Sequence, residues 1–169
     1  MRRAPTLVPR GTLVVDWAFF GEICRALALR VARDYQPEVV LGIAKAGVIP
    51  GAVVSSILQC EFASMAVTRR DEGAEPILVA GPPASIRGRR VLLVDETCDS
   101  GNTMRLALNE VRSHRPVEVR TAVSFKTGPY QPDYHAFETE NFIILPWDRE
   151  IIQNGELVVR PDYAARLGS

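Results

Sequence analysis

The sequence predicts an α/β domain with a parallel β-sheet flanked by helices, and three observations support this. Short apolar runs alternate with helical patterns, which is the order expected of strand–helix–strand units. The run 91–94 is apolar at every position, as in strands that are covered on both faces. The chain has 169 residues, 47% hydrophobic and 24% charged, which suits one globular domain over 1–169.

The first helix and strand are predicted by spacing and by a proline. Asp16 is expected to cap a helix, because apolar side chains recur every three or four positions from Trp17 to Val31. Pro37 stops this pattern. The β-branched run 38–43 that follows indicates a buried strand.

A second helix, a strand and a long loop come next. Residues 48–58 predict the helix, with Pro50 tolerated in its first turn. Residues 61–69 predict the strand. Residues 70–87 are rich in Gly and Pro and predict a long loop, in which 77–79 are candidates for a strand pair.

The second half of the chain repeats the alternation. Residues 90–94 and 117–125 predict strands, and 103–113 predict the helix between them. Residues 131–137 are expected to form a loop with an aromatic contact surface. The tail after Asp162 is expected to lie at the surface or to fray.

Composition and charge exclude several classes of protein. Lys plus Arg is 20 and Asp plus Glu is 20, so a nucleic-acid binder with a basic excess is not expected. No apolar run approaches the roughly 20 residues of a membrane span, so no membrane association is expected. The three cysteines are widely spaced and form no CxxC, which argues against a zinc site or a disulfide framework. Cytoplasmic residence is the default expectation.

The segment 91–103 joins an apolar strand, an acidic pair and a polar loop to a helix. Ligands of open α/β sheets bind outside the carboxyl ends of strands, where Asp95 and Glu96 are expected to stand. Gly101 lets backbone N–H groups approach an anion, and the helix adds its N-terminal N–H groups. The loop also contains two hydroxyl donors, Ser100 and Thr103. These features predict a phosphate site beside carboxylates that suit sugar hydroxyls or a divalent metal.

The alternative for the acidic pair alone is a solvated strand end followed by a turn and a helix cap. The complete segment favours a ligand site, because several ligand-binding features coincide within it. The segment is not a P-loop, since no lysine follows the glycine at the required place.

This segment resembles the PRPP-binding motif of the type I phosphoribosyltransferases. Residues 42–51 resemble the pyrophosphate loop of that family. Residues 123–126 and 142–148 resemble the base-binding parts of its 6-oxopurine branch, most closely the bacterial xanthine-guanine type. The resemblance implies a type I phosphoribosyltransferase fold in a single domain, with a flexible hood loop over 70–87 and a base-binding segment over 126–150.

The resemblance also implies roles for individual residues that bind PRPP. Asp95 and Glu96 would hold the ribose hydroxyls and associated Mg²⁺, and Asp99 would be the catalytic carboxylate near purine N7. The 5′-phosphate loop would consist of Asp99, Ser100, Gly101, Asn102 and Thr103. The pyrophosphate would be bound by Lys45, Ala46, Gly47 and Arg69, with Arg70 as the neighbouring candidate for Arg69.

Two details qualify the pyrophosphate loop. The family often has a cis peptide there. Arginine is commoner at the position of Lys45 in this branch, and lysine keeps the charge but lacks the bidentate fork of a guanidinium.

The purine would be bound by residues of the base-binding segment. Lys126 would reach the exocyclic O6, and its alternative is a surface lysine. Phe142 would stack on the base, and its alternative is a core residue. Ile143 would present backbone groups to the base edge, and Asp148 would lie near the base and the metal.

The function implied is transfer of the phosphoribosyl group from PRPP to guanine, xanthine or hypoxanthine, with Mg²⁺, release of pyrophosphate and a role in purine salvage. The resemblance also implies a homodimer or homotetramer. The alternative is a non-catalytic regulator that senses PRPP or a nucleotide on the same fold. Such a regulator would be expected to lack the catalytic carboxylate or to have a basic surface, and this chain has Asp99 and no net charge.

Overall fold

The computed structural model describes residues 11–70 and 74–168, and these residues form two compact units. The first unit runs from Ile23 to Thr139. The second unit combines residues 11–22 with residues 140–168. None of the described helices has the length and apolar character that a membrane span requires.

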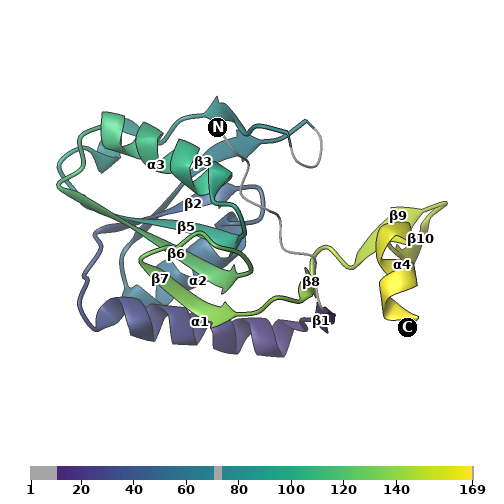
Figure 1. Cartoon of the computed structure of the whole chain (residues 1–169). Coiled ribbons are helices and arrows are strands. Elements are labelled where there is room, and N and C mark those ends of the chain that lie inside the picture. Colours follow the sequence, from purple (N-terminus) through teal and green to yellow (C-terminus); the bar gives the residue numbers. More distant parts are fainter. Residues whose placement is uncertain (1–10, 71–73, 169) are drawn as a thin grey trace. The chain divides into compact units, whose positions relative to one another are not determined.

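The first unit is built on a six-stranded sheet with the order β4-β3-β2-β5-β6-β7 (Figure 1). All neighbouring strands are parallel except β4, which runs antiparallel to β3. The strands are β2 (Val39–Ala44), β3 (Glu61–Thr68), β4 (Ile77–Ala80), β5 (Arg90–Cys98), β6 (Glu118–Lys126) and β7 (Tyr134–Glu138). The central strand β5 pairs with β2 and β6, and the side chains of its apolar run 91–94 are buried.

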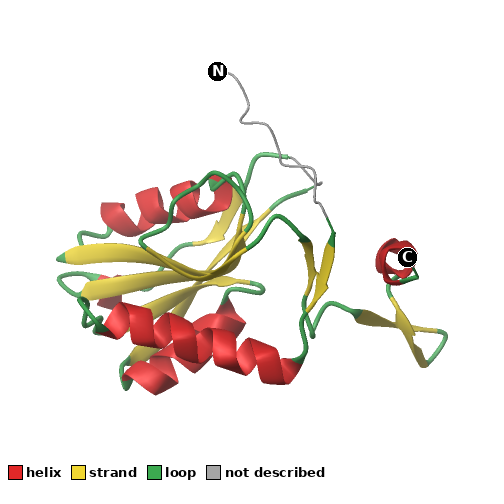
Figure 2. Ribbon diagram, turned by 60° about the horizontal axis from the view of Figure 1, so that its bottom comes forward, coloured by secondary structure: helices red, strands yellow, loops and turns green. Residues whose placement is uncertain are grey.

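Helices cover both faces of this sheet (Figures 1 and 2). One face carries α2 (Val48–Leu58) and the portion of α1 (Trp17–Ala32) that belongs to the first unit, and the other carries α3 (Asn102–Ser113). Asp16 caps α1, because its Oδ1 accepts a hydrogen bond of 2.7 Å from the backbone N–H of Phe19. The α/β class predicted from the sequence is therefore confirmed.

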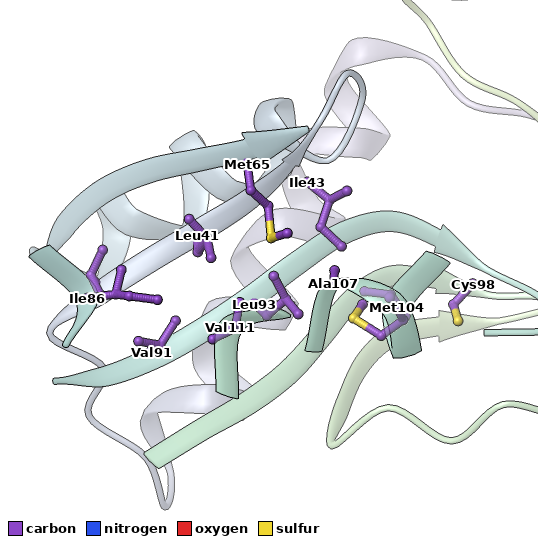
Figure 3. Close-up of a cluster of buried hydrophobic side chains, with 12 residues drawn as sticks. Leu41, Ile43, Met65, Ile86, Val91, Leu93, Cys98, Met104, Ala107 and Val111 are labelled. Carbon is purple, nitrogen blue, oxygen red and sulfur yellow. The ribbon is translucent and has the colours of Figure 1, made fainter. Parts of the chain in front are cut away.

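A cluster of buried apolar side chains lies between the sheet and α3 (Figure 3). It includes side chains from β2, β3, β5, β6 and α3, together with Ile86 from the short 3₁₀ helix η1 (Ala84–Ile86). Its buried members are Val39, Leu41, Ile43, Met65, Ile86, Val91, Leu93, Cys98, Met104, Ala107, Val111 and Val123. Because β2, β3, β5 and β6 all contribute side chains to this cluster, its packing holds these strands in place relative to one another.

The second unit consists of two small pairs of strands and a helix. The strand β1 (Thr12–Val14) runs parallel to β8 (Phe142–Ile144). The antiparallel hairpin of β9 (Glu150–Gln153) and β10 (Glu156–Val159) precedes the helix α4 (Pro161–Leu167). Within this unit the rings of Phe20 and Trp147 pack edge to face, with centroids 4.8 Å apart.

Several predicted elements differ from the structure. The strand expected over 90–94 continues to Cys98, because β6 pairs with it as far as Lys126. The loop expected over 131–137 is wrong for residues 134–137, because β7 adds to the sheet edge there, whereas 131–133 form no strand or helix. The tail after Asp162, expected to lie at the surface or to fray, does lie at the surface, because α4 has no buried residue. The helix itself was not predicted, and it begins at Pro161, a favourable first helical position.

The segment 70–87 combines a predicted and an unpredicted feature. A strand was predicted around 77–79 and is present as β4. The η1 helix was not predicted, and its Ile86 is fully buried. Residues 71–73 lie outside the described part of the chain.

Replacing Ile86 with alanine should lower the free energy of unfolding by about 2–5 kcal/mol, because it empties a fully buried site. Urea unfolding followed by circular dichroism would measure the change. The matched control is Ile77→Ala, in which the side chain is 41% exposed and the loss should stay below about 1 kcal/mol. Equal losses in the two variants would contradict the anchoring role of Ile86.

Candidate active site

A cleft of about 320 Å³ lies at the carboxyl ends of β2, β3 and β5 in the first unit. Its walls come from the loop before α2, the end of β3 and the loop between β5 and α3. The lining residues are Ile43, Ala44, Lys45, Ala46, Val67, Thr68, Arg69, Asp95, Glu96, Thr97, Cys98, Asp99, Ser100, Gly101, Thr103 and Met104. Most of the residues predicted from the sequence to bind PRPP therefore meet in one place.

The acidic pair contributes one buried and one half-buried carboxyl group. Asp95 is 8% exposed, and the backbone N–H of Glu96 donates to its Oδ1 at 3.0 Å. Burial raises the pKa of Asp95 well above its usual value, and the negative charge of Glu96 raises it further. A ligand that donates hydrogen bonds or carries positive charge would stabilise the ionised form of Asp95.

The loop before α2 approaches this carboxyl group closely. The Ala44–Lys45 peptide bond is cis, as the resemblance predicts. A Cβ atom on Gly47 would lie 2.8 Å from Asp95 Oδ1 and 2.6 Å from the carbonyl oxygen of Ile43. Only glycine fits at this position. Gly47 is therefore needed for the shape of the loop, although Gly47 itself does not line the cleft.

The loop before α3 has the geometry of an anion site. Gly101 has a φ of +79°, and a Cβ there would lie 2.2 Å from the Tyr130 ring, so glycine is required. Asn102 is the first residue of α3, whose N-terminal N–H groups follow directly. Arg105 holds the loop from behind, because its Nη1 donates to the carbonyl oxygen of Ser100 at 2.8 Å. Arg105 also stacks over the Tyr130 ring at 4.9 Å.

Two basic side chains, Lys45 and Arg69, face the same cleft. Arg69 Nη2 donates to Thr103 Oγ1 at 2.8 Å, which joins the end of β3 to the start of α3. The neighbouring Arg70 is not among the lining residues. The structure therefore favours Arg69 as the cleft arginine.

Asp99 presents an unsatisfied oxygen. Its Oδ1 is buried and has no hydrogen-bond partner among the described residues. A Cβ on Gly128 would lie 2.0 Å from this oxygen, so Gly128 must be glycine for the carboxylate to keep its place. Buried acceptors are normally paired, so the unpaired Oδ1 marks Asp99, which also lines the cleft, as a candidate functional residue.

Cys98 lines the cleft but is not poised to react. Burial raises the pKa of its thiol to about 12, and the nearby Asp95 adds to this. The thiol therefore stays protonated near neutral pH, as expected of a buried inert cysteine.

Lys126 lies on β6 beside Cys98 in the pairing with β5. Its side chain is buried, and Nζ forms an ion pair with Glu138 of β7. The alternative of an exposed surface lysine is therefore wrong. Lys126 is not among the residues that line the cleft.

The remaining candidates, Phe142, Ile143 and Asp148, belong to the second unit. Arg166 lies over the Phe142 ring at 4.2 Å, and Ile143 pairs with Leu13 of β1. Asp148 accepts hydrogen bonds of 2.5 Å from Arg160 Nη1 and from the hydroxyl of Tyr163. Within its own unit Asp148 is thus already bound by two donors.

Four residues that hold candidate site residues in place were not predicted from the sequence: Arg105, Gly128, Tyr130 and Glu138. Gly128 stands before Pro129, a signal for a turn. The contacts of the other three depend on which strands and loops are neighbours, and no local pattern reveals them.

Residues 14–156 match the family described as the phosphoribosyl transferase domain. The chain is 29% identical over 143 residues to a xanthine-guanine phosphoribosyltransferase of Gluconobacter oxydans, covering 79% of this chain and 83% of that protein. It is 26% identical over 95 residues to phosphoribosyltransferase domain-containing protein 1 of Xenopus laevis, covering 52% of this chain but only 42% of that protein.

The fold is similar to the crystal structure of a purine phosphoribosyltransferase from Pyrococcus horikoshii, with a TM-score of 0.75 and 27% identity. That match covers 86% of this chain and 99% of the other. The family match covers most of the chain, including the whole cleft with its acidic pair and both loops. The chain therefore belongs to the phosphoribosyltransferase family of transferase enzymes.

Proposed function

We propose that this protein transfers the 5-phosphoribosyl group from PRPP to a 6-oxopurine (guanine, xanthine or hypoxanthine) with release of pyrophosphate, in purine salvage. One observation carries the proposal, namely that a single cleft unites an acidic pair, a glycine loop at a helix N-terminus and two basic side chains. PRPP has the matching chemistry, because its ribose hydroxyls lie between two separate phosphate groups. Two of the relatives, the Gluconobacter oxydans and Pyrococcus horikoshii proteins, are named as purine phosphoribosyltransferases, which supports the choice of a purine.

The two ends of PRPP would meet different partners. The 5′-phosphate would bind at the loop of residues 100–103, where backbone N–H groups and hydroxyls donate hydrogen bonds. The pyrophosphate would lie against Lys45 and Arg69, which stabilise the negative charge that develops as it leaves. Asp95 and Glu96 would accept hydrogen bonds from the ribose hydroxyls between these ends.

The acidic pair also fits Mg²⁺, because Mg²⁺ prefers carboxylate oxygens supplemented by substrate oxygens. Asp95 and Glu96 are the residues that would hold it, and their mutual repulsion favours a cation. Bound Mg²⁺ would neutralise charge on the departing pyrophosphate. Asp148 fits this role poorly, since both its oxygens accept hydrogen bonds from Arg160 and Tyr163.

Asp99 would take the proton of the purine nitrogen or stabilise it electrostatically. Asp99 lines the cleft, which supports a role beside the base, and its buried Oδ1 has no hydrogen-bond partner among the described residues. The roles of Phe142, Ile143 and Asp148 in binding the base stay predictions, as does cytoplasmic residence.

Purified protein with PRPP and Mg²⁺ should release pyrophosphate in the presence of guanine, xanthine or hypoxanthine. Asp99→Asn should reduce kcat about a hundredfold or more, the usual contribution of an acid–base residue. Calorimetric titration with PRPP serves as the control, because the variant should still bind it. Absence of turnover with every one of the three bases, or full activity of the variant, would refute the proposal.

Asp95→Asn should abolish most activity and yet stabilise the free protein by about 1–3 kcal/mol at pH 7.5, because it removes a buried charge. The raised pKa means that the folded state holds the Asp95 proton to higher pH than the unfolded state does. The free energy of unfolding of the parent therefore falls as the pH rises. The extra stability of Asp95→Asn relative to the parent should shrink toward pH 4.

Urea unfolding in EDTA at the two pH values measures this difference. Glu96→Gln is the matched control and should give a smaller gain, because Glu96 keeps more contact with solvent. If Asp95→Asn is less stable than the parent at pH 7.5, burial of the Asp95 carboxylate does not destabilise the folded protein, which would contradict this prediction.

Lys126→Met should raise the KM for the purine about tenfold or more and leave the KM for PRPP unchanged, if Lys126 donates to O6. Glu138→Gln is the matched control, since it weakens the same ion pair but keeps the ammonium group. Steady-state kinetics on both variants would separate the two roles. An equal rise of the purine KM in both would show that only the ion pair matters.

A further inference from the structure

The loop of residues 100–103, where the 5′-phosphate of PRPP would bind, contains no basic side chain. Three carboxyl groups also line the cleft, those of Asp95, Glu96 and Asp99. A phosphate that binds near them needs positive charge close by, because carboxylates and phosphate repel one another. The pyrophosphate would occupy Lys45 and Arg69, so a further source of positive charge is expected at the loop.

Arg105, in the first turn of α3, contacts this loop from outside the cleft. Its Nη1 donates to the carbonyl oxygen of Ser100 at 2.8 Å and to Asn102 Oδ1 at 3.2 Å. Arg105 is not among the residues that line the cleft. The guanidinium group therefore binds the loop and leaves the ligand space of the cleft open.

The peptide group between Ser100 and Gly101 connects Arg105 to the cleft. Among the described residues the only cis peptide bond is Ala44–Lys45, so the peptide between Ser100 and Gly101 is trans. In a trans peptide the C=O and N–H groups point in opposite directions. The carbonyl oxygen of Ser100 points to Arg105, so the N–H of Gly101 points away from Arg105, and Gly101 lines the cleft.

A cation on the carbonyl oxygen of Ser100 also makes the N–H of Gly101 a better donor. Hydrogen bonds in a chain polarise one another, and a bond from an ionised donor is roughly twice as strong as a neutral one. The positive charge of Arg105 would thus act on a phosphate in the cleft through the peptide group. The N-terminal N–H groups of α3 would add to the same effect.

Tyr130 keeps the guanidinium group in this position. Arg105 lies over the ring of Tyr130, 4.9 Å from the ring centroid. The ring also lies against the loop, because a Cβ atom on Gly101 would be 2.2 Å from it. The backbone N–H of Tyr130 donates to the carbonyl oxygen of Asp99 at 3.3 Å. Arg105 is therefore held by the loop and by a ring that itself contacts the loop.

We propose that Arg105 is a positioning residue for the 5′-phosphate, which directs the N–H of Gly101 into the cleft and supplies positive charge behind the loop. This inference rests on the proposed function, because it takes a phosphate ester as the ligand of the loop. PRPP and the nucleotide product GMP have a 5′-phosphate, so their binding depends on Arg105. Pyrophosphate would bind at Lys45 and Arg69, so its binding does not.

Calorimetric titration with GMP and, in the presence of Mg²⁺, with PRPP and pyrophosphate tests this inference. Arg105→Met should raise the Kd for GMP and for PRPP about tenfold, because it removes a hydrogen bond from a charged donor. The Kd for pyrophosphate should change by less than about twofold. Arg105→Lys keeps the charge but lacks the planar fork, so it should recover part of the lost affinity.

Steady-state kinetics give a second measurement. The 5′-phosphate takes no part in bond breaking, so Arg105→Met should raise the KM for PRPP and leave kcat and the KM for the purine unchanged. A general structural defect would change all three constants.

The matched control is Arg112→Met, which removes the same charge from an exposed arginine about two turns further along α3. It should bind every ligand as the parent does, and thermal unfolding should show that all variants fold. The inference is overturned if Arg105→Met binds GMP as tightly as the parent, or if it loses GMP and pyrophosphate equally. It is also overturned if Arg105→Lys recovers nothing, or if Arg112→Met loses as much affinity for GMP as Arg105→Met.

These outcomes differ from a failure of the proposed function. Parent protein that binds neither PRPP nor GMP would overturn the proposed function and this inference with it. Parent protein and Arg105→Met that bind both ligands equally tightly would overturn the role of Arg105 alone.

Discussion

The burial of β5 is the constraint on which the rest of the first unit depends. Its residues Val91, Leu92, Leu93 and Val94 are fully buried, and strands pair with it on both sides. Helices pack on both faces of the sheet that it centres, so its direction and register have little freedom. The polar end of the same strand is thereby presented to the cleft at a fixed position, with Asp95 still inside the sheet.

The cleft places groups of opposite charge close together, and its shape depends on positions that have no side chain. Glycines at 47, 101 and 128 each stand where a side chain would collide with a neighbouring group. Two of these glycines protect the positions of carboxylates, and the third shapes the anion loop. The arrangement of the cleft therefore depends on glycines as well as on charged side chains. Burial of Asp95 raises its pKa, and buried carboxyl groups of this kind, lining a cleft, are typical of functional sites.

Much of this arrangement was predictable from the sequence, for physical reasons. The period of apolar residues indicated α1, α2, α3 and the buried strands, and the segment 91–103 indicated the phosphate loop. Local sequence patterns did not predict the elements whose structure depends on strand pairing. The edge strand β7 and the hairpin of β9 and β10 have no buried run, and Glu138 meets Lys126 only because β7 lies beside β6. The burial of Ile86 likewise depends on the distant residues around it.

The anchoring of Ile86 restricts where chain length can vary during evolution. The resemblance treats 70–87 as one hood, but β4 is tied to β3 and Ile86 is tied to the core. Insertions between Ala80 and Arg90 would therefore disturb packing beneath the central strands. None of the described residues between Thr68 and Ile77 belongs to the buried cluster, so differences in chain length among relatives should be concentrated there rather than between Ala80 and Arg90.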